Sequence, residues 1–131
     1  AKQEGKMVRK IVPDIINEQE VASMPGNTSI REVGRYMVDH GVGSILIMED
    51  GELKGIFTER DALRIFVATR RSPDQTNVAD VMTGNLETIS PDASPEEALK
   101  RMTKGNFRHM PVVDDSGKVF GVVSQRDLIS R

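Results

Sequence analysis

The chain of 131 residues has no cysteine and no tryptophan, and only one tyrosine and four phenylalanines. The absence of cysteine excludes a disulfide framework, thiolate metal ligands and a cysteine nucleophile, and it fits a cytoplasmic location. No apolar run approaches the roughly 20 residues that would span a bilayer. The N-terminus lacks the apolar segment of a secretion signal. We therefore expect a soluble globular protein without a membrane partner.

The chain also lacks a surplus of charge. Eighteen basic residues stand against 20 acidic ones, and neither sign is gathered into a block. Because nucleic-acid binders usually need a basic surplus for their phosphate contacts, we expect no nucleic-acid partner. At this length, folding buries about two thirds of the unfolded surface, which is enough for one core. We expect residues 1–7, which are mostly polar, to form a flexible arm outside it.

An internal repeat is the main positive feature of the sequence. Gly55–Leu63 reads GIFTERDAL, and Gly121–Ile129 reads GVVSQRDLI, 66 residues later. In the earlier part of each copy, matching residues are 65 positions apart, because Ser116 is an insertion in the second copy. A unit of about 60 residues would be marginal alone, so the two copies should share one core. The predicted boundaries are residues 8–69 for the first copy, 70–77 for a polar linker and 78–131 for the second copy.

Each copy is predicted to contain a short strand, a helix, two strands and a second helix. Ser29 and Ser94 begin capping-box patterns, and apolar residues then recur at helical spacing. Short apolar runs on either side of Asp50-Gly51 and of Ser116-Gly117 predict two hairpins. The predicted strands of the hairpins are residues 44–48, 53–57, 110–113 and 119–123, and the predicted last helices are residues 59–68 and 125 to the C-terminus. The sequence thus predicts an α/β (α+β) fold made of duplicated β-α-β-β-α units.

The motif G-h-h-[TS]-x-R-D, where h is apolar, occurs once in each copy at the point where a strand becomes a helix. Its members are Gly55, Thr58, Arg60 and Asp61, and then Gly121, Ser124, Arg126 and Asp127. The hydroxyl and the carboxylate have the spacing of a helix cap, which needs no ligand. A helix N-terminus with a hydroxyl and an arginine also suits a phosphate, and a carboxylate can accept hydrogen bonds from a sugar. Capping alone requires neither the arginine nor the glycine, so the repetition of the whole set favours ligand binding.

In these segments each copy resembles a CBS domain, the repeat first named from cystathionine β-synthase, and the two together resemble the tandem pair called a Bateman module. The matching text is DVMTGNLETISPDASPEEALKRM and FRHMPVVDDSGKVFGVVSQRD in the second copy, and SIREVGRYM and SILIMEDGELKGIFTERD in the first. The resemblance covers about residues 8 to 130. The first copy departs from the pattern where Gly26-Asn27 replaces Pro91-Asp92 and Leu46 replaces Pro111.

The resemblance implies a pseudo-twofold module, with the repeats packed through their sheets and ligand clefts between them. Such clefts commonly bind AMP, ATP, NAD or S-adenosylmethionine as regulatory ligands, without a reaction and without a required cofactor. By matching position, the ribose contacts are Asp61 and Asp127, and the phosphate contacts are Thr58, Arg60, Ser124 and Arg126. The implied adenine contacts are Thr88, Ile89, Met110 and Val112 in the Asp61 cleft, and Ser23, Met24, Ile45 and Ile47 in the Asp127 cleft. These eight residues would also be strand core without any ligand.

The pair Arg108-His109 distinguishes the second copy from the first, which has Gly43-Ser44 at the same place. A basic pair that enters a strand can be a solvated strand end or a hydrogen-bonded structural pair. The resemblance implies instead that both residues reach the phosphates of the ligand held by Asp127. The two clefts are then expected to differ.

Other chemistry is not indicated. His40 and His109 are the only histidines, and neither has a second histidine at metal-ligand spacing, so we expect no metal site. Gly41-Val42-Gly43 lacks the rest of a dinucleotide fingerprint. No nucleophile with a base and an orienting group is marked by the sequence, so we expect no enzyme.

The functional prediction is a regulatory, adenine-nucleotide-sensing module in signal transduction. The alternatives are a ligand-free dimerisation or protein-interaction module, and a regulatory fragment of a larger enzyme or transporter. Between residues 62 and 68 only Arg64 is polar, and a helix that is apolar nearly all round must be covered on more than one side. We therefore expect a homodimer built on helical faces. The downstream protein partner is not indicated.

Overall fold

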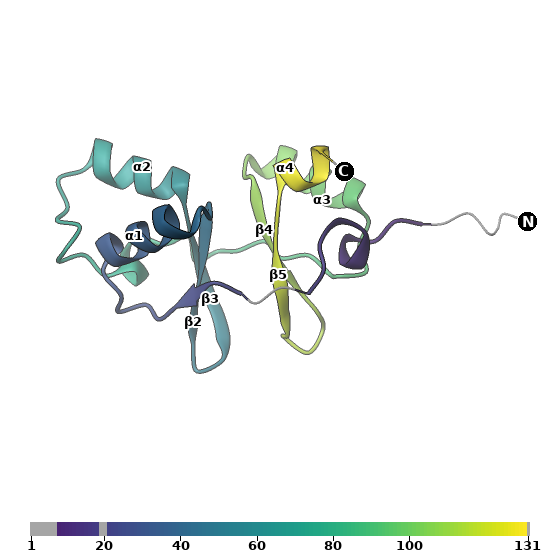
Figure 1. The fold of residues 1–131 in the computed structure, drawn as a ribbon, viewed down its shortest axis with the longest axis horizontal. Coiled ribbons are helices and arrows are strands. Elements are labelled where there is room, and N and C mark those ends of the chain that lie inside the picture. Colours follow the sequence, from purple (N-terminus) through teal and green to yellow (C-terminus); the bar gives the residue numbers. More distant parts are fainter. Residues whose placement is uncertain (1–7, 19–20, 131) are drawn as a thin grey trace, which may run out of the picture. The chain divides into compact units, whose positions relative to one another are not determined.

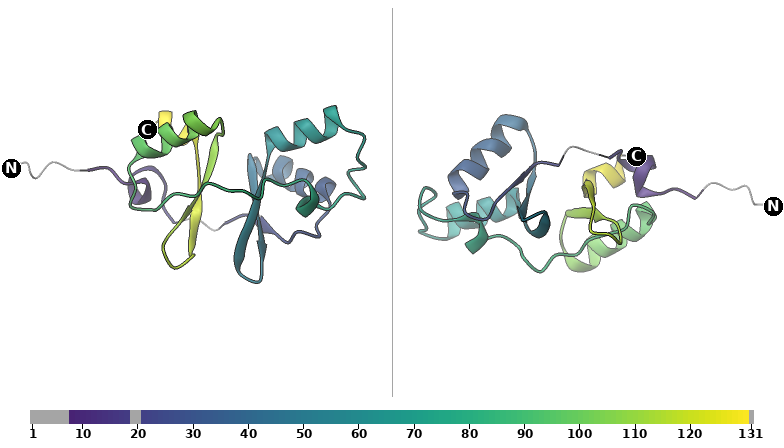
Figure 2. Two further views of the ribbon diagram at one scale, coloured as in Figure 1. Left: turned by 180° about the vertical axis from the view of Figure 1, so that it is seen from behind. Right: turned by 90° about the horizontal axis from the view of Figure 1, so that it is seen from below.

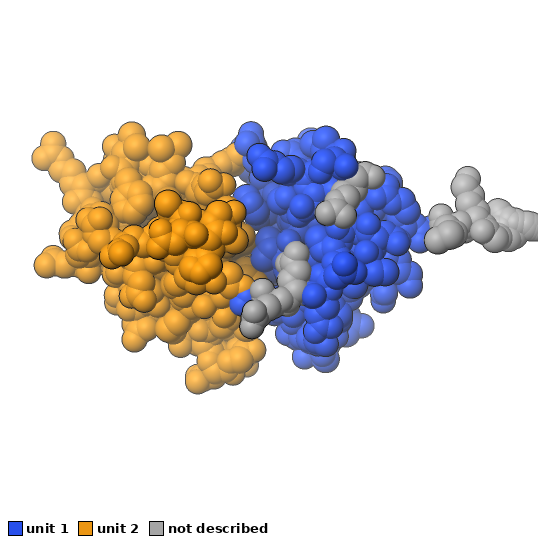
Figure 3. Space-filling model, viewed as in Figure 1, with its two compact units in different colours: residues 1–21, 87–131 blue, residues 22–86 orange. Residues whose placement is uncertain are grey.

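The computed structural model describes residues 8–18 and 21–130, so the predicted arm at residues 1–7 lies outside the described residues. The chain forms two compact units, which Figure 3 shows in different colours. We call residues 22–86 the first-repeat unit, and residues 1–21 with 87–131 the second-repeat unit. Each unit has its own buried apolar cluster.

The first-repeat unit has the predicted order of elements. These are β1 (Ser23–Met24), α1 (Ile30–His40), β2 (Ser44–Glu49), β3 (Glu52–Thr58), α2 (Glu59–Ala68) and the 3-10 turn η2 (Val78–Asp80). The sheet order is β1-β2-β3, with β1 parallel and β3 antiparallel to β2. Figures 1 and 2 show α1 and α2 on one face of this sheet. Val33, Phe57 and Ile65 are buried in the core between the sheet and these helices.

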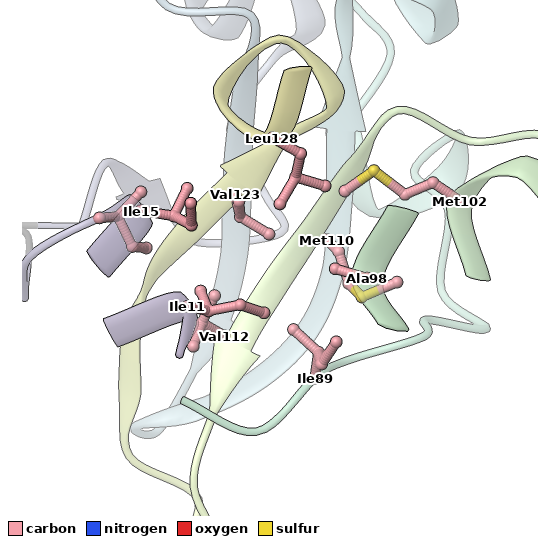
Figure 4. Close-up of a cluster of buried hydrophobic side chains, with 10 residues drawn as sticks. Ile11, Ile15, Ile89, Ala98, Met102, Met110, Val112, Val123 and Leu128 are labelled. Atoms are coloured by element: carbon pink, nitrogen blue, oxygen red, sulfur yellow. The ribbon is translucent and has the colours of Figure 1, made fainter. Parts of the chain in front are cut away.

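The second-repeat unit repeats this architecture with a reduced first strand. Its elements are η1 (Ile11–Ile15), α3 (Pro95–Gly105), β4 (His109–Val113), β5 (Val119–Ser124) and α4 (Gln125–Ile129). In place of a strand like β1 it has a single parallel bridge between Ile89 and Val112. Figure 4 shows the core, a buried cluster that includes Ile11 from the N-terminal segment together with Met102 and Val123. The predicted mixed α/β class is confirmed, with this one strand shortened to a bridge.

The predicted helix starts and hairpins are present. The Ser29 Oγ accepts the Glu32 N–H at 3.2 Å, and the Ser94 Oγ accepts the Glu97 N–H at 3.1 Å. The β2–β3 turn has positive φ at both Asp50 (53°) and Gly51 (80°), as in a type I′ turn. The β4–β5 connection is longer, and the Asp114 side chain organises it. The insertion at Ser116 therefore changes the way in which the turn is built.

Each compact unit takes a short segment from the start of the other sequence copy. The Ile11 N–H donates to the Ala93 carbonyl at 2.9 Å, and the Val78 N–H donates to the Thr28 carbonyl at 2.8 Å. Ile11 and Val78 are both completely buried. The core of each unit is thus completed by residues from the first few positions of the other copy.

Candidate functional site

The repeated motif forms the same capped turn in both units. At the end of β3, the Thr58 Oγ1 accepts the Asp61 N–H at 3.2 Å, and the Asp61 Oδ2 accepts the Thr58 N–H at 3.0 Å. At the end of β5, the Ser124 Oγ accepts the Asp127 N–H at 3.1 Å, and the Asp127 Oδ2 accepts the Ser124 N–H at 2.9 Å. Both are reciprocal capping boxes, so each motif begins a helix irrespective of any ligand.

The backbone donors of these turns are largely engaged. The Glu59 N–H donates to the Gly43 carbonyl at 3.1 Å, and the Gln125 N–H donates to the Arg108 carbonyl at 2.8 Å. The Asp61 and Asp127 N–H groups serve the caps. A helix N-terminus attracts anions through its unpaired N–H groups, and few remain here. An anion at either turn would therefore depend mainly on side chains.

The structure brings the predicted basic pair to the second turn. His109 is the β-sheet partner of Ser124. Arg108 comes directly before His109, and its carbonyl accepts the Gln125 N–H. Arg108 and Arg126 are exposed, and His109 is half-buried. These side chains give the second turn a cationic edge.

The first turn has a different edge. Ser44 is the β-sheet partner of Thr58, so Gly43-Ser44 takes the place of the basic pair without its charge. Arg60 is exposed there. The residues beside the two turns thus differ, and the expected difference between the two ligand clefts stays a prediction.

The carboxylates of the two motifs are also placed differently. Asp61 is buried, with 8% of its surface exposed, and its Oδ1 lies 3.4 Å from the Arg64 Nη2. Asp127 is half-buried. Arg64 was not among the residues predicted from the motif. Its signal in the sequence is the spacing of three residues on one helix, which places the two side chains next to each other.

Most of the residues that are predicted to contact adenine have side chains buried in the core. The completely or almost completely buried members are Ile45, Ile47, Ile89, Met110 and Val112. Met24 is half-buried, whereas Ser23 and Thr88 are exposed. The buried side chains cannot touch a ligand in this conformation, so any contact would use backbone atoms. Their role in binding adenine stays a prediction.

The glycine of the first motif has a packing explanation. A Cβ on Gly55 would lie 2.4 Å from the Met82 Sδ, far inside contact distance. In the second motif Gly121 has φ of 155°. Because a side chain at position 55 would force Met82 to move, packing offers a reason for a glycine there, and Gly55 does not by itself indicate a ligand. Nothing in the motif's spacing points to Met82, so sequence reasoning missed this contact.

Within residues 8–18 and 21–130, no three histidine or acidic side chains come together as metal ligands. In the same residues, no helix has the length and apolar content needed to cross a bilayer.

Comparisons with known proteins give the family. The model of the CBS domain matches residues 11–68 and again residues 78–131. An uncharacterized protein of Methanopyrus kandleri is 33% identical over 90% of this chain, which spans 60% of that protein's length. The CBS domain-containing protein YhcV of Bacillus subtilis is 38% identical, over 83% of this chain and 76% of its own.

Two solved structures extend the comparison. The CBS domain protein PAE2072 from Pyrobaculum aerophilum, complexed with AMP, has a TM-score of 0.75 and 28% identity, over 83% of each chain. The CBS domain pair of protein MJ0100, in complex with 5′-methylthioadenosine and S-adenosyl-L-methionine, has a TM-score of 0.79 and 27% identity, over 91% of this chain and 96% of its own. With two matches to the family model along its length and neighbours of the same fold, the chain belongs to the CBS domain family and carries two CBS repeats.

Proposed function

We propose that the chain is a regulatory module that binds adenine nucleotides at its two capped strand-to-helix turns. The observation that carries the proposal is that both repeats place an acidic cap residue beside exposed arginine at the end of a strand. Two relatives of the same fold are complexes, one with AMP and the other with 5′-methylthioadenosine and S-adenosyl-L-methionine. Asp61 and Asp127 would accept the ribose hydroxyls.

The capping role of these aspartates leaves room for a ribose. An ionised carboxylate has about four positions at which it can accept hydrogen bonds. At the second turn, the cap uses the Asp127 Oδ2 for the Ser124 N–H. Capping and ribose binding can therefore occur together at Asp127.

Phosphate groups would be held by side chains at both turns. Since few backbone N–H groups remain unpaired, the exposed arginines are the strongest donors available. The phosphate contacts of the proposal are Thr58 and Arg60 at the first turn, and Ser124, Arg126, Arg108 and His109 at the second. The second turn has Arg108, Arg126 and His109, whereas Arg64 at the first turn is paired with Asp61. We therefore expect the second turn to prefer phosphorylated ligands more strongly.

Binding is proposed to occur without turnover. The proposal gives the side chains of the candidate site ribose and phosphate contacts, and it assigns none of them the role of nucleophile or general base. Incubation with ATP or NAD should leave the nucleotide intact over hours. Hydrolysis that co-elutes with the protein and is lost in Asp127→Ala would contradict this.

Titration calorimetry with AMP, ATP, NAD and S-adenosylmethionine tests the function. Saturable binding of at least one of them is the expected result. No binding by any of the four would overturn the proposal and favour a ligand-free interaction module. Mass spectrometry of compounds that co-purify under native conditions would identify the natural ligand.

A specific observation also favours association with a second copy of the chain. Helix α2 exposes large apolar side chains: Leu63 is 64%, Phe66 43% and Val67 74% exposed. We propose that this face forms a homodimer interface. Light scattering at micromolar concentration should give twice 14.5 kDa, and Val67→Glu should give the monomer mass. A monomer at every concentration of the unchanged chain would overturn the dimer.

A further inference from the structure

The carboxylate of Asp61 has little accepting capacity left. Its Oδ2 accepts from the Thr58 N–H at 3.0 Å and from the Thr58 hydroxyl at 3.1 Å. Its Oδ1 accepts from the Arg64 Nη2 at 3.4 Å. Since an ionised carboxylate has about four accepting positions, these three hydrogen bonds leave about one.

The carboxylate of Asp127 is much less occupied. Among the described residues, only the Ser124 N–H donates to it, at 2.9 Å, and no cation forms an ion pair with it. The position that corresponds to Arg64 holds Ser130, whose hydroxyl donates to the Arg126 carbonyl at 2.6 Å instead. With respect to residues 8–18 and 21–130, about three accepting positions therefore remain at Asp127.

A ribose diol donates two hydrogen bonds. The Asp127 carboxylate can accept both while the helix cap stays intact. At Asp61, both can be accepted only if the Arg64 guanidinium leaves Oδ1. We propose that Arg64 is a selectivity residue, whose ion pair with Asp61 must be displaced by ribose, so that the first repeat binds nucleosides more weakly than the second. This inference rests on the proposed ribose role of the two aspartates.

The expected size of the effect follows from the exposure of the pair. The Arg64 side chain is 55% exposed and that of Asp61 11% exposed, so water screens the interaction from one side. Ion pairs of this kind are weak, and their loss corresponds to about a two- to five-fold change in an equilibrium constant. The effect should shrink further in about 1 M salt, where charges are screened within about 3 Å.

In the experiment, Arg64 and its counterpart Ser130 are each replaced by the other residue type. Adenosine binding is measured at one repeat at a time. In an Asp127→Ala background, where only the first repeat can hold ribose, Arg64→Ser should tighten adenosine binding about two- to five-fold. In an Asp61→Ala background, Ser130→Arg should weaken adenosine binding by a similar factor. Adenosine is the probe because it has no phosphate that could attract the arginine. Calorimetry gives the dissociation constants.

Arg70→Ser is the matched control, because Arg70 is exposed beyond the end of α2 and the same charge is removed. It should leave adenosine binding unchanged. If Arg64→Ser leaves adenosine binding unchanged or weakens it, while Asp61→Ala still abolishes binding at the first repeat, this inference alone is overturned. If Asp61→Ala and Asp127→Ala together leave adenosine binding intact, or if the unchanged chain binds no adenosine, the ribose assignment fails and the inference fails with it.

Discussion

The two strand-to-helix turns share their backbone and differ at their edges. Both have a reciprocal capping box, and in both the first helical N–H donates to the residue before the neighbouring strand. The second turn has Arg108 and His109 at that edge, whereas the first has Gly43 and Ser44. The comparison shows that the cap and sheet pairing set where the carboxylate lies. Under the proposed function, the neighbouring side chains would then decide which ligand groups the carboxylate meets.

The largest expected effect comes from removing both aspartates. The Asp61→Ala and Asp127→Ala double variant should weaken AMP and adenosine alike by about 100-fold or more, because each site loses hydrogen bonds worth about 1.5–3 kcal/mol each. Calorimetry measures this loss. The double variant would remove the proposed ribose contact from both turns and leave the difference at their edges in place.

The control separates ligand binding from capping. Ser94→Ala removes a helix cap at the start of α3, outside the motif, and should cost about 1 kcal/mol of stability without changing the affinity. Nucleotide affinity that survives in the double aspartate variant would mean that these residues only cap their helices.

The next effect sharpens the difference between the turns. Arg108→Ala should weaken AMP binding at the second turn by about 10- to 100-fold, since one charge-assisted hydrogen bond is worth about 1.5–3 kcal/mol. Adenosine, which has no phosphate, should bind as before. Both ligands are titrated against the Asp61→Ala background, so that only the second turn is measured.

Lys104→Ala provides the control for Arg108, because Lys104 is an exposed cation in the last turn of α3. It should leave both affinities unchanged. An equal loss for adenosine and AMP in Arg108→Ala would show that Arg108 supports the fold of the turn and does not contact phosphate.

The sequence was sufficient for the features that depend on local patterns. The duplication, the helix caps at Ser29 and Ser94, and the two hairpins were predicted within about one residue, because capping and turn formation involve neighbours along the chain. The candidate carboxylates were also predicted correctly as cap residues. The helix-capping pattern and the resemblance to the CBS domain both pointed to Asp61 and Asp127.

Long-range packing could not be predicted in this way. Ile11 and Val78 each pack into the unit that is formed mainly by the other sequence copy. These contacts join residues far apart in the sequence, and no periodic pattern predicts them. The contact of Gly55 with Met82 belongs to the same class. The engagement of Asp61 by Arg64 is local, and its spacing could have predicted it. The repeated motif ends at Asp61, and Arg64 lies outside it.

A smaller effect compares the glycines that begin the two motifs. Gly55→Ala should destabilise the fold by about 1–3 kcal/mol, because the new Cβ would overlap the Met82 Sδ. Adding Met82→Ala should recover part of that loss, since it removes the clashing atoms. Urea unfolding of the two single variants and the double variant measures the coupling.

Gly121→Ala serves as the comparison for this pair. Its φ of 155° is a backbone conformation that an L side chain rarely adopts, so truncating a neighbour should not rescue it. Additive effects of Gly55→Ala and Met82→Ala would contradict the packing explanation for Gly55.

The smallest expected effect concerns the two hairpins. Each hairpin lowers the pKa of one of its carboxyl groups, but by a different interaction. In the first hairpin, the hydrogen bond and charge of Lys54 lower the pKa of Glu52. In the second, the pKa of Asp114 is lowered chiefly by the hydroxyl of Ser116, with backbone N–H groups adding to the effect. Because both folded-state pKa values lie below their unfolded values, each carboxylate stabilises the fold above its unfolded pKa, and this contribution is lost as the pH falls through the folded pKa.

Salt should separate the two hairpins, because a charge is screened and a hydroxyl is not. In about 1 M NaCl, the pKa of Glu52 should rise toward its ordinary value while the pKa of Asp114 hardly moves. Lys54→Ala should raise only the former and Ser116→Ala only the latter. NMR titration of the two side-chain carboxyl carbons measures both in one sample. A salt-sensitive Asp114 would mean that the nearby Lys118 charge, and not the Ser116 hydroxyl, holds the second hairpin's carboxylate ionised.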